Sequence, residues 1–194
     1  PIRLAMPGTH NIQNALAAIL VCLEQGGKFS AIQSGLAGFS GVDRRFTIRA
    51  EISSAQGRSI TIVDDYGHHP TEIQATLNAA RAVWPERTIY AVFQPHRYSR
   101  VQQLESEFCQ SFNQADHVVV CPVYRAGERP IDGLDQHRIA QGIAEHGHHS
   151  VWPVDDLDQA VDSLAGRIGP GDVVITLGAG DVNKVCTSLE RRIS

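Results

Sequence analysis

The sequence has few of the residues that build metal frameworks or disulfide scaffolds. Its 194 residues include only four cysteines, which lie far apart and form no Cys-x-x-Cys pair. That spacing argues against a zinc ribbon and gives no disulfide framework. We therefore expect reduced cysteines in the core or on helices, at Cys22, Cys109, Cys121 and Cys186.

Long apolar runs are also missing. No stretch approaches the roughly 20 residues of a membrane-spanning helix, and residues 1–7 have neither the basic region nor the apolar core of a signal peptide. The net charge of −4 at pH 7 argues against a general nucleic-acid-binding protein, which normally carries an excess of basic residues. We expect a globular protein of the cytoplasm, with neither membrane nor nucleic acid as a partner.

Two catalytic signatures are absent as well. Gly8-Thr9-His10 resembles part of a phosphate-binding loop, but the Gly-Lys-Ser/Thr that supplies a phosphate-binding lysine does not follow it. No serine or cysteine stands in a Gly-x-Ser-x-Gly elbow. The sequence thus predicts neither a phosphate loop nor nucleophilic catalysis.

The stretch around which the chain is organised is residues 60–73. Ile60 to Val63 form a β-branched apolar run typical of a buried strand, and this run ends in Asp64-Asp-Tyr-Gly-His-His69. The following Pro70-Thr-Glu72 suits the first turn of a helix, where a missing N–H costs nothing and an acid meets the positive dipole end. In an open α/β sheet, such a strand-to-helix crossover lies at the edge where ligands bind.

From residue 60 onward, apolar strands alternate with helices. Predicted strands cover 60–63, 88–93, 117–122, 151–154 and 172–177, and predicted helices cover 72–84, about 100–114, 134–145, 157–168 and the segment after 182. Near-continuous apolar strands are typical of strands buried on both faces. The predicted fold class is α/β, a doubly wound, mostly parallel sheet flanked by helices, with its strand ends gathered along one edge.

The first forty residues have a helical pattern of their own. We predict one helix capped by Thr9 or Asn11 and closed at Gly26-Gly27, followed by a short amphipathic helix over 29–39. Because a mature chain normally begins with Met, Pro1 suggests a chain cut from a longer protein.

A glycine-rich break at 38–41 marks the predicted domain boundary. A half-exposed strand over 44–52 follows it, with a turn at Gln56-Gly57. Arg44 and Arg45 stand at this boundary, either as a solvated strand end or as a place where an arginine reaches across a domain cleft to a phosphate.

The strand ends indicate a site for an anionic ligand. His96, Arg97 and Arg100 place three potential cations just beyond a strand and at a helix start, where backbone N–H groups add to the positive field. A carboxylate or a phosphate is the natural ligand of such a group.

Two further groups admit alternative interpretations. Asp64, Asp65, His68 and His69 could bind a metal, but the cluster also suits hydrogen bonding to sugar hydroxyls. Asn11 and Asn14, three residues apart on one helical face, could bind a purine edge or simply cap and solvate the helix.

Four motifs, in order, resemble the Mur ligase family over essentially the whole chain. They are Pro7-Gly-Thr-His-Asn-Ile-Gln-Asn-Ala-Leu-Ala-Ala18, Gly41-Val-Asp-Arg-Arg-Phe46, Asp64-Asp-Tyr-Gly-His-His-Pro-Thr-Glu72 and Phe93-Gln-Pro-His-Arg-Tyr-Ser-Arg100. The last motif, together with Val123-Tyr-Arg-Ala-Gly-Glu128, is most similar to the branch of the family that adds L-alanine to UDP-N-acetylmuramate in peptidoglycan synthesis.

The resemblance implies a division of the chain and a reaction. Residues 1–41 would be the C-terminal end of the central ATP-binding domain, and residues 42–194 would be the Rossmann-like, amino-acid-binding domain. The reaction would be ATP-dependent amide-bond formation through an acyl phosphate. ATP and Mg²⁺ would be bound mainly by parts of the enzyme that are absent from this chain. The missing N-terminal domain and the missing part of the central domain would be its partners.

The resemblance also implies roles for individual residues. Asn11 and Asn14 would lie near the adenine, Asp65 at the ribose and Arg45 at the γ-phosphate. Tyr66, His68, His96, Arg97 and Arg100 would form the amino-acid pocket, with Arg45 and His68 as the catalytic pair and no protein ligand to a metal. Two alternatives stay open, namely a ligase that recycles a murein tripeptide and a non-catalytic module that binds a nucleotide or an anion.

Overall fold

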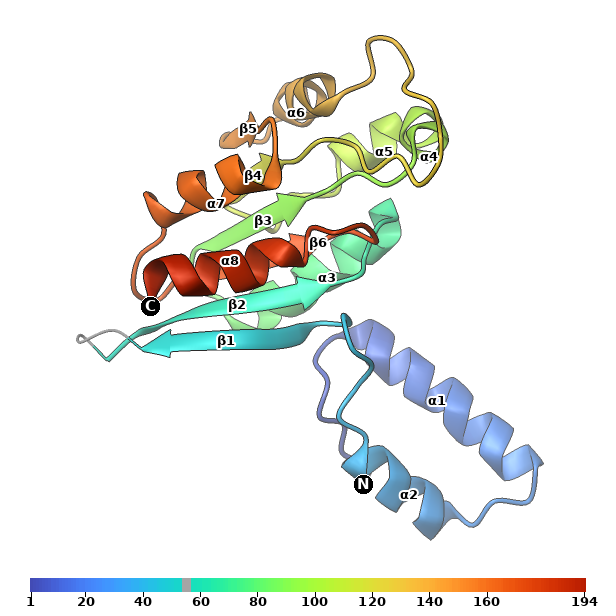
Figure 1. The fold of residues 1–194 in the computed structure, drawn as a ribbon. Coiled ribbons are helices and arrows are strands. Elements are labelled where there is room, and N and C mark those ends of the chain that lie inside the picture. Colours follow the sequence, from blue (N-terminus) through green and yellow to red (C-terminus); the bar gives the residue numbers. More distant parts are fainter. Residues whose placement is uncertain (54–56) are drawn as a thin grey trace.

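A single sheet forms the centre of the larger part of the molecule, as the computed structural model shows (Figure 1). In spatial order its strands are β1 (Thr47–Ser53), β2 (Ser59–Asp65), β6 (Val173–Leu177), β3 (Ile89–Phe93), β4 (His117–Val120) and β5 (Val151–Pro153). Strands β2 to β6 pair in parallel, and only β1, among the described strands, runs antiparallel to its neighbour. The mostly parallel α/β sheet is therefore confirmed.

The structure describes residues 1–53 and 57–194. The predicted turn at Gln56-Gly57 lies partly outside this described part. Among the described residues, no helix is both long enough and apolar enough to cross a bilayer.

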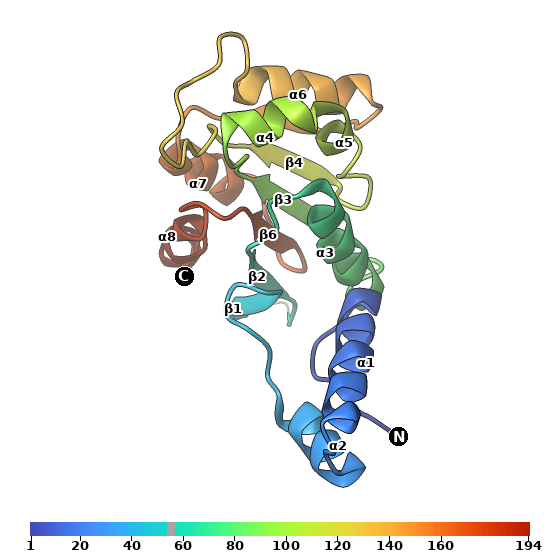
Figure 2. The ribbon, with the colours of Figure 1, turned by 90° about the vertical axis from the view of Figure 1, so that its right-hand side faces the viewer.

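Helices cover both faces of the sheet (Figure 2). One face carries α3 (Pro70–Val83), α4 (Tyr98–Gln103), α5 (Glu105–Cys109) and α6 (Gln136–Glu145), and the other carries α7 (Leu157–Ala165) and α8 (Lys184–Ile193). Every residue of β3 and β6 is buried, because apolar side chains from both layers pack on these central strands. The strands therefore read as continuous apolar runs instead of alternating ones.

The strand order creates crevices beside β6. The connections after β2 and β3 lead to helices on one face, whereas the connection after β6 leads to α8 on the opposite face. In doubly wound sheets, ligands bind where neighbouring connections part in this way.

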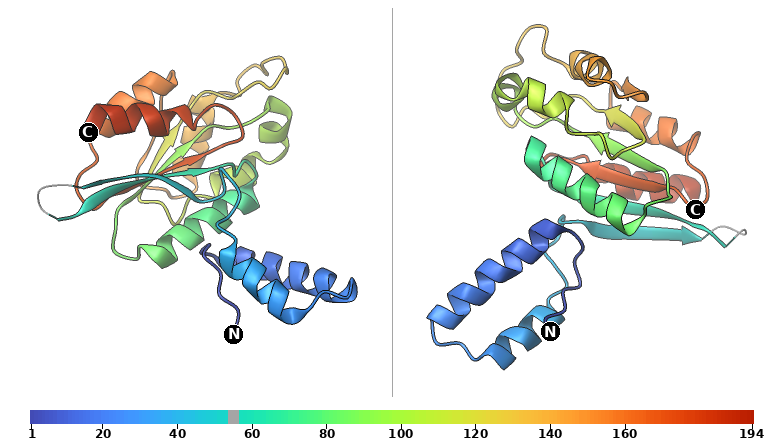
Figure 3. Two further views of the ribbon diagram at one scale, coloured as in Figure 1. Left: turned by 60° about the horizontal axis from the view of Figure 1, so that its bottom comes forward. Right: turned by 180° about the vertical axis from the view of Figure 1, so that it is seen from behind.

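An arm of two helices, α1 (Thr9–Glu24) and α2 (Phe29–Gly38), extends away from the sheet (Figure 3). Only Ala15 and Ile19 of α1 are buried, and Leu16, Leu20 and Val21 are each more than half exposed. The arm thus presents apolar side chains that the rest of the described chain does not cover.

Local details differ from the sequence prediction at the helix ends. Neither Thr9 nor Asn11 caps α1, because Gly8 takes the N-cap position and Asn11 Nδ2 donates to the carbonyl of Pro7 at 2.6 Å. The helix expected over about 100–114 is two short helices that separate at Leu104. Of the cysteines, all free, Cys22 is exposed on α1 and the other three are buried.

Candidate functional site

The turn before β1 directs neighbouring side chains in opposite directions. Arg44 and Phe46 have positive φ values of 59° and 51°, a conformation that non-glycine residues hold only where their surroundings demand it. The Phe46 ring stacks on Trp84 with centroids 5.7 Å apart, and the backbone N–H of Phe46 donates to Asp65 Oδ2 at 2.8 Å. Arg45 lies between the two left-handed residues and is turned toward a cavity.

A cavity of about 500 Å³ lies between the start of α1, the 39–46 segment and the start of α3, and it is called the nucleotide-side cavity after the ligand that the resemblance assigns to its residues. Its volume is typical of a small-ligand site. The cavity brings together all four residues to which the resemblance assigns ATP binding. Its lining consists of Met6, His10, Asn11, Asn14, Phe39, Val42, Arg45, Phe46, Asp65, Thr71, Glu72, Ala75 and Thr76.

Asp65 is the buried acid of the cavity, with only 4% of its surface exposed. Oδ1 accepts the N–H of Gly67 at 2.7 Å, and Oδ2 accepts that of Phe46. Burial raises the pKa of Asp65, although these two amides and the nearby Arg45 act to lower it. The side chain of Thr76 is a further donor to this carboxylate, which still keeps acceptor capacity for a ligand.

Glu72 holds the other side of the cavity. Its carboxylate accepts the N–H groups of His68 and His69 in the capping box that begins α3, and it lies 3.4 Å from Arg45 Nη1. Burial acts to raise the pKa of Glu72, but these contacts outweigh it and the pKa is lowered. The side chain of Arg45 is half exposed, so a stronger anion could draw it away from Glu72.

A row of aromatic rings follows the carboxyl edge beyond the cavity. Tyr66 meets His68 edge-on with centroids 5.3 Å apart, His68 lies 5.7 Å from His96, and His96 stacks on Tyr124 at 5.4 Å. The Cζ atom of Arg45 lies 5.7 Å from the centre of the Tyr66 ring. Arg45, which lines the cavity, therefore links it to the row through Tyr66.

The two histidines of the row present different atoms to solvent. His68 Nδ1 lies 3.0 Å from the carbonyl of Tyr66, which can only accept, so neutral His68 carries its proton on Nδ1. His96 Nδ1 lies 3.2 Å from Arg100, which can only donate, so neutral His96 carries its proton on Nε2. Burial and the charges of Arg100, His68 and Arg97 lower the pKa of His96.

Two arginines beside the row, Arg97 and Arg100, lie at the beginning of α4. Arg97 is exposed, takes the N-cap position with φ 69°, and donates its N–H to the carbonyl of Tyr124 at 2.9 Å. Arg100, one turn later, is partly buried against His96. The expected cluster of His96, Arg97 and Arg100 is thus present at the edge of the sheet.

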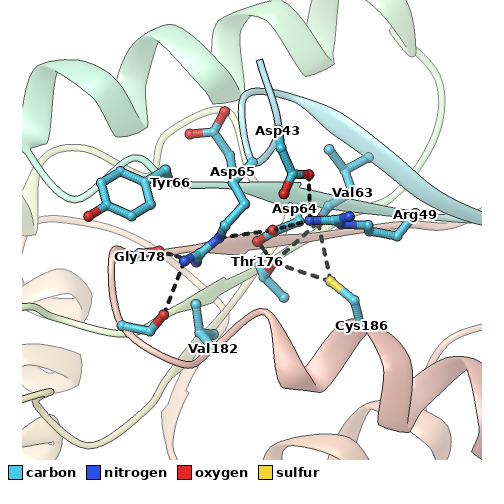
Figure 4. A network of polar contacts seen from close by, with 12 residues as sticks. Asp43, Arg49, Val63, Asp64, Asp65, Tyr66, Thr176, Gly178, Val182 and Cys186 are labelled. Carbon is cyan, nitrogen blue, oxygen red and sulfur yellow. Dashed lines mark hydrogen bonds and ion pairs between the residues drawn. The ribbon is translucent and has the colours of Figure 1, made fainter. Parts of the chain in front are cut away.

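An ion-pair network lies beneath the site, and the sequence did not single it out (Figure 4). The side chain of Asp64 is completely buried and pairs with Arg44 at 3.1 Å and with Arg49 at 3.2 Å. Thr176 of β6 donates to its other oxygen at 2.9 Å. A doubled acid at the end of an apolar strand was the available signal, because adjacent strand residues point to opposite faces.

The described residues offer no ready metal site. Nowhere among them do three or more His, Cys, Asp or Glu side chains stand close enough to hold one ion. Asp64 is enclosed by its arginines, and Asp65 lies on the opposite side of the strand, bonded to backbone amides.

The fold and the sequence place the chain in a family of ligases, and the chain belongs to the Mur ligase family. Residues 44–180 match the family model described as "Mur ligase, glutamate ligase domain". The chain is 50% identical over 181 residues to a UDP-N-acetylmuramate–L-alanine ligase of Desulforapulum autotrophicum. The aligned residues cover 93% of this chain and 39% of that protein.

Solved structures show the same relationship. The UDP-N-acetylmuramate-alanine ligase MurC from Thermotoga maritima matches with a TM-score of 0.80 and 29% identity, over 98% of this chain and 39% of that one. A murein peptide ligase from Psychrobacter arcticus shares the fold, with a TM-score of 0.72 and 21% identity over 99% of this chain and 38% of that one. The chain thus spans about two fifths of the length of these proteins.

Proposed function

We propose that the chain is the C-terminal part of an ATP-dependent ligase that joins L-alanine to UDP-N-acetylmuramate in peptidoglycan synthesis. The 50% identity to a ligase of that name carries the proposal, and the nucleotide-side cavity, linked to the ring row through Arg45 and Tyr66, supports it. Residues 1–41 are then the end of a central ATP-binding domain, and residues 42–194 are the amino-acid-binding domain. We place this reaction in the cytoplasm, where ATP is available.

The nucleotide-side cavity suits the nucleoside of ATP. The side-chain amide nitrogen of Asn11 donates a hydrogen bond to the carbonyl of Pro7. The side-chain oxygen of Asn11 can then accept a hydrogen bond from an adenine amino group. Asp65 can accept a ribose hydroxyl with its remaining acceptor capacity. Arg45, exchanging Glu72 for a phosphate, would meet the γ-phosphoryl group with a charge-assisted hydrogen bond.

Magnesium does not fit a site made by this chain alone. The two carboxylates of the cavity, Asp65 and Glu72, already accept two backbone amides each. We therefore assign Mg²⁺ to ATP and to the preceding part of the enzyme, and no role of the described residues depends on it.

The ring row suits the amino acid. Arg97, Arg100 and the Nε2–H of His96 all donate, so together they can hold the carboxylate of alanine. The free Nε2 of His68 is an acceptor close to the same place and can take a proton from the alanine ammonium group.

These groups support a two-step amide synthesis. The muramate carboxylate attacks the γ-phosphorus of ATP, which releases ADP and gives an acyl phosphate. The deprotonated amine of alanine then attacks the carbonyl carbon, and inorganic phosphate leaves as the amide forms. Arg45 stabilises the charge on the transferred phosphoryl group, and the ring row positions the amine.

The direct test is alanine-dependent phosphate release from the full-length enzyme with ATP and UDP-N-acetylmuramate. We expect release with L-alanine and little with the murein tripeptide in its place. Release that depends on the tripeptide instead would assign the chain to the recycling ligases, and no release with either would support a non-catalytic binding module.

The amino-acid pocket has a test of its own in Arg97→Ala. We expect the KM for alanine to rise roughly tenfold or more while the KM for ATP changes little, because a hydrogen bond to a charged group contributes about 1.5–3 kcal/mol. Arg129→Ala, at another exposed position, is the matched control. An equal rise in both KM values would argue against the pocket.

A further inference from the structure

The crevice between β2 and β6 is filled by a side chain of the protein itself. Strand connections part here toward opposite faces, which is where an open α/β sheet usually binds a ligand. The guanidinium of Arg44 bonds to Asp64 at the end of β2 and to the carbonyl of Gly178 just beyond β6. On the proposed function, the nucleotide would bind beside this crevice, in the nucleotide-side cavity.

Arg44 joins three segments with its guanidinium. Nε donates to Asp64 Oδ2 at 3.1 Å, Nη2 to the carbonyl of Gly178 at 2.7 Å, and Nη1 to the carbonyl of Gly180 at 3.2 Å. Its side chain is only 18% exposed. A planar group with a fixed fork of donors can hold such a geometry, whereas an ammonium group is a point charge.

The backbone of Arg44 reaches the site from the same residue. Its carbonyl accepts the N–H of Tyr66 at 2.6 Å, and its Cζ atom lies 5.0 Å from the centre of the Tyr66 ring. Its φ of 59° also sets the direction of the turn that aims Arg45 into the cavity. Left-handed backbone at such a residue persists only when surrounding contacts hold it.

We propose that Arg44 is a positioning residue, which holds Arg45 toward the nucleotide and Tyr66 toward the amino acid by anchoring their backbone to the loop after β6. This inference rests on the proposed function for what the two side chains contact. It assigns to adjacent arginines two different tasks, one of binding and one of alignment.

Arg49 provides a matched control. It pairs with the same oxygen of Asp64 at 3.2 Å and with Asp43 at 2.8 Å, so its loss also deprives Asp64 of one cation (Figure 4). Its partners lie within the 43–65 segment, away from the carbonyls of Gly178 and Gly180. Arg49→Gln therefore tests the charge of Asp64 without releasing the loop after β6.

The experiment compares Arg44→Gln, Arg44→Lys and Arg49→Gln in the full-length enzyme. We expect Arg44→Gln and Arg49→Gln to lower the Tm by similar amounts. Only Arg44→Gln should lower kcat, roughly 10- to 100-fold, and raise the KM for alanine, because misplaced reacting groups react more slowly. Arg44→Lys keeps a charge for Asp64 but loses the fork, so we expect it to recover Tm and not kcat. A smaller folded fraction alone would not change a KM.

Hydrogen exchange gives a readout that is independent of activity. In Arg44→Gln, or in Arg44→Lys if the glutamine variant does not fold, we expect faster exchange at the amides of Tyr66 and residues 178–181, and no change there in Arg49→Gln. Equal kinetic losses in Arg44→Gln and Arg49→Gln, full kcat in Arg44→Lys, or unchanged exchange would overturn the inference. If the wild-type enzyme shows no alanine-dependent activity, the proposed function fails and exchange alone decides the role of Arg44.

Discussion

Adjacent residues in this site do different work. Asp64 is enclosed by Arg44 and Arg49, while Asp65 faces the nucleotide-side cavity from the opposite side of β2. Because successive strand residues point to opposite faces, one acid can complete the core and the next can meet a ligand. The same division separates Arg44 from Arg45, although a turn and not a strand produces it.

His96 makes stability depend on pH. Burial and the neighbouring cations lower its pKa in the folded chain below the value of about 6.5 of an unfolded chain. As the pH falls through about 6.5, the unfolded chain takes up the proton first, so the free energy of unfolding decreases.

We expect His96→Gln to reduce this loss of stability. Urea unfolding at about pH 7.5 and about pH 5.5, on either side of the ordinary histidine pKa, would measure it. A wild-type slope in His96→Gln would show that other groups carry the effect.

At the scale of elements, the loop after β6 meets the loop after β4. The backbone of Gly180 lies so close to the Tyr124 ring that a Cβ atom placed there would be 2.7 Å from two of its ring atoms, and it would also collide with Gln94. Tyr124 in turn stacks on His96. Two loops, which lead to helices on opposite faces of the sheet, thus support the same histidine.

Gly180→Ala should disturb the amino-acid site from a distance. The added methyl group would displace Tyr124 and then His96, so we expect kcat/KM for alanine to fall roughly tenfold or more. Gly169→Ala is the control, because a Cβ atom there meets open space. Steady-state kinetics with varied alanine would measure both, and a wild-type value in Gly180→Ala would show that the ring row tolerates movement.

At the scale of the whole molecule, the nucleotide-side cavity joins the helical arm to the sheet. Its lining comes from α1, from the 39–46 segment and from α3. In the segment that connects arm and sheet, Gly41 has a φ of 102°, a conformation readily available only to glycine. A rotation of the arm about this segment would open or close the cavity, and we propose it as the hinge of the ligase.

The 194-residue chain alone should not ligate. It has no Gly-Lys-Ser/Thr loop for the phosphates of ATP, and the apolar face of its arm is uncovered. We expect no alanine-dependent phosphate release from the purified chain with ATP and UDP-N-acetylmuramate. A cooperative unfolding transition would show that the purified chain is folded. Alanine-dependent phosphate release from this chain would contradict the assignment of phosphate binding to another part of the enzyme.

The sequence by itself determined the fold class and the place of the site. Apolar runs bounded by turn residues are local signals, so the alternation of strands and helices after residue 60 could be predicted. Parallel strands then place their carboxyl ends along one edge, which brings His68, His96 and Arg97 together without any knowledge of side-chain contacts. The motifs of the site indicated the family for the same reason, because each is a short, contiguous stretch.

Only the tertiary structure decided what each side chain of that edge does. Arg44 and Arg45 are chemically identical neighbours, and the left-handed turn alone sends one to Asp64 and the other to the cavity. The place of β6 between β2 and β3 depends on pairing between distant segments, and so does the burial of Asp64. Such long-range packing leaves no periodic trace in the sequence.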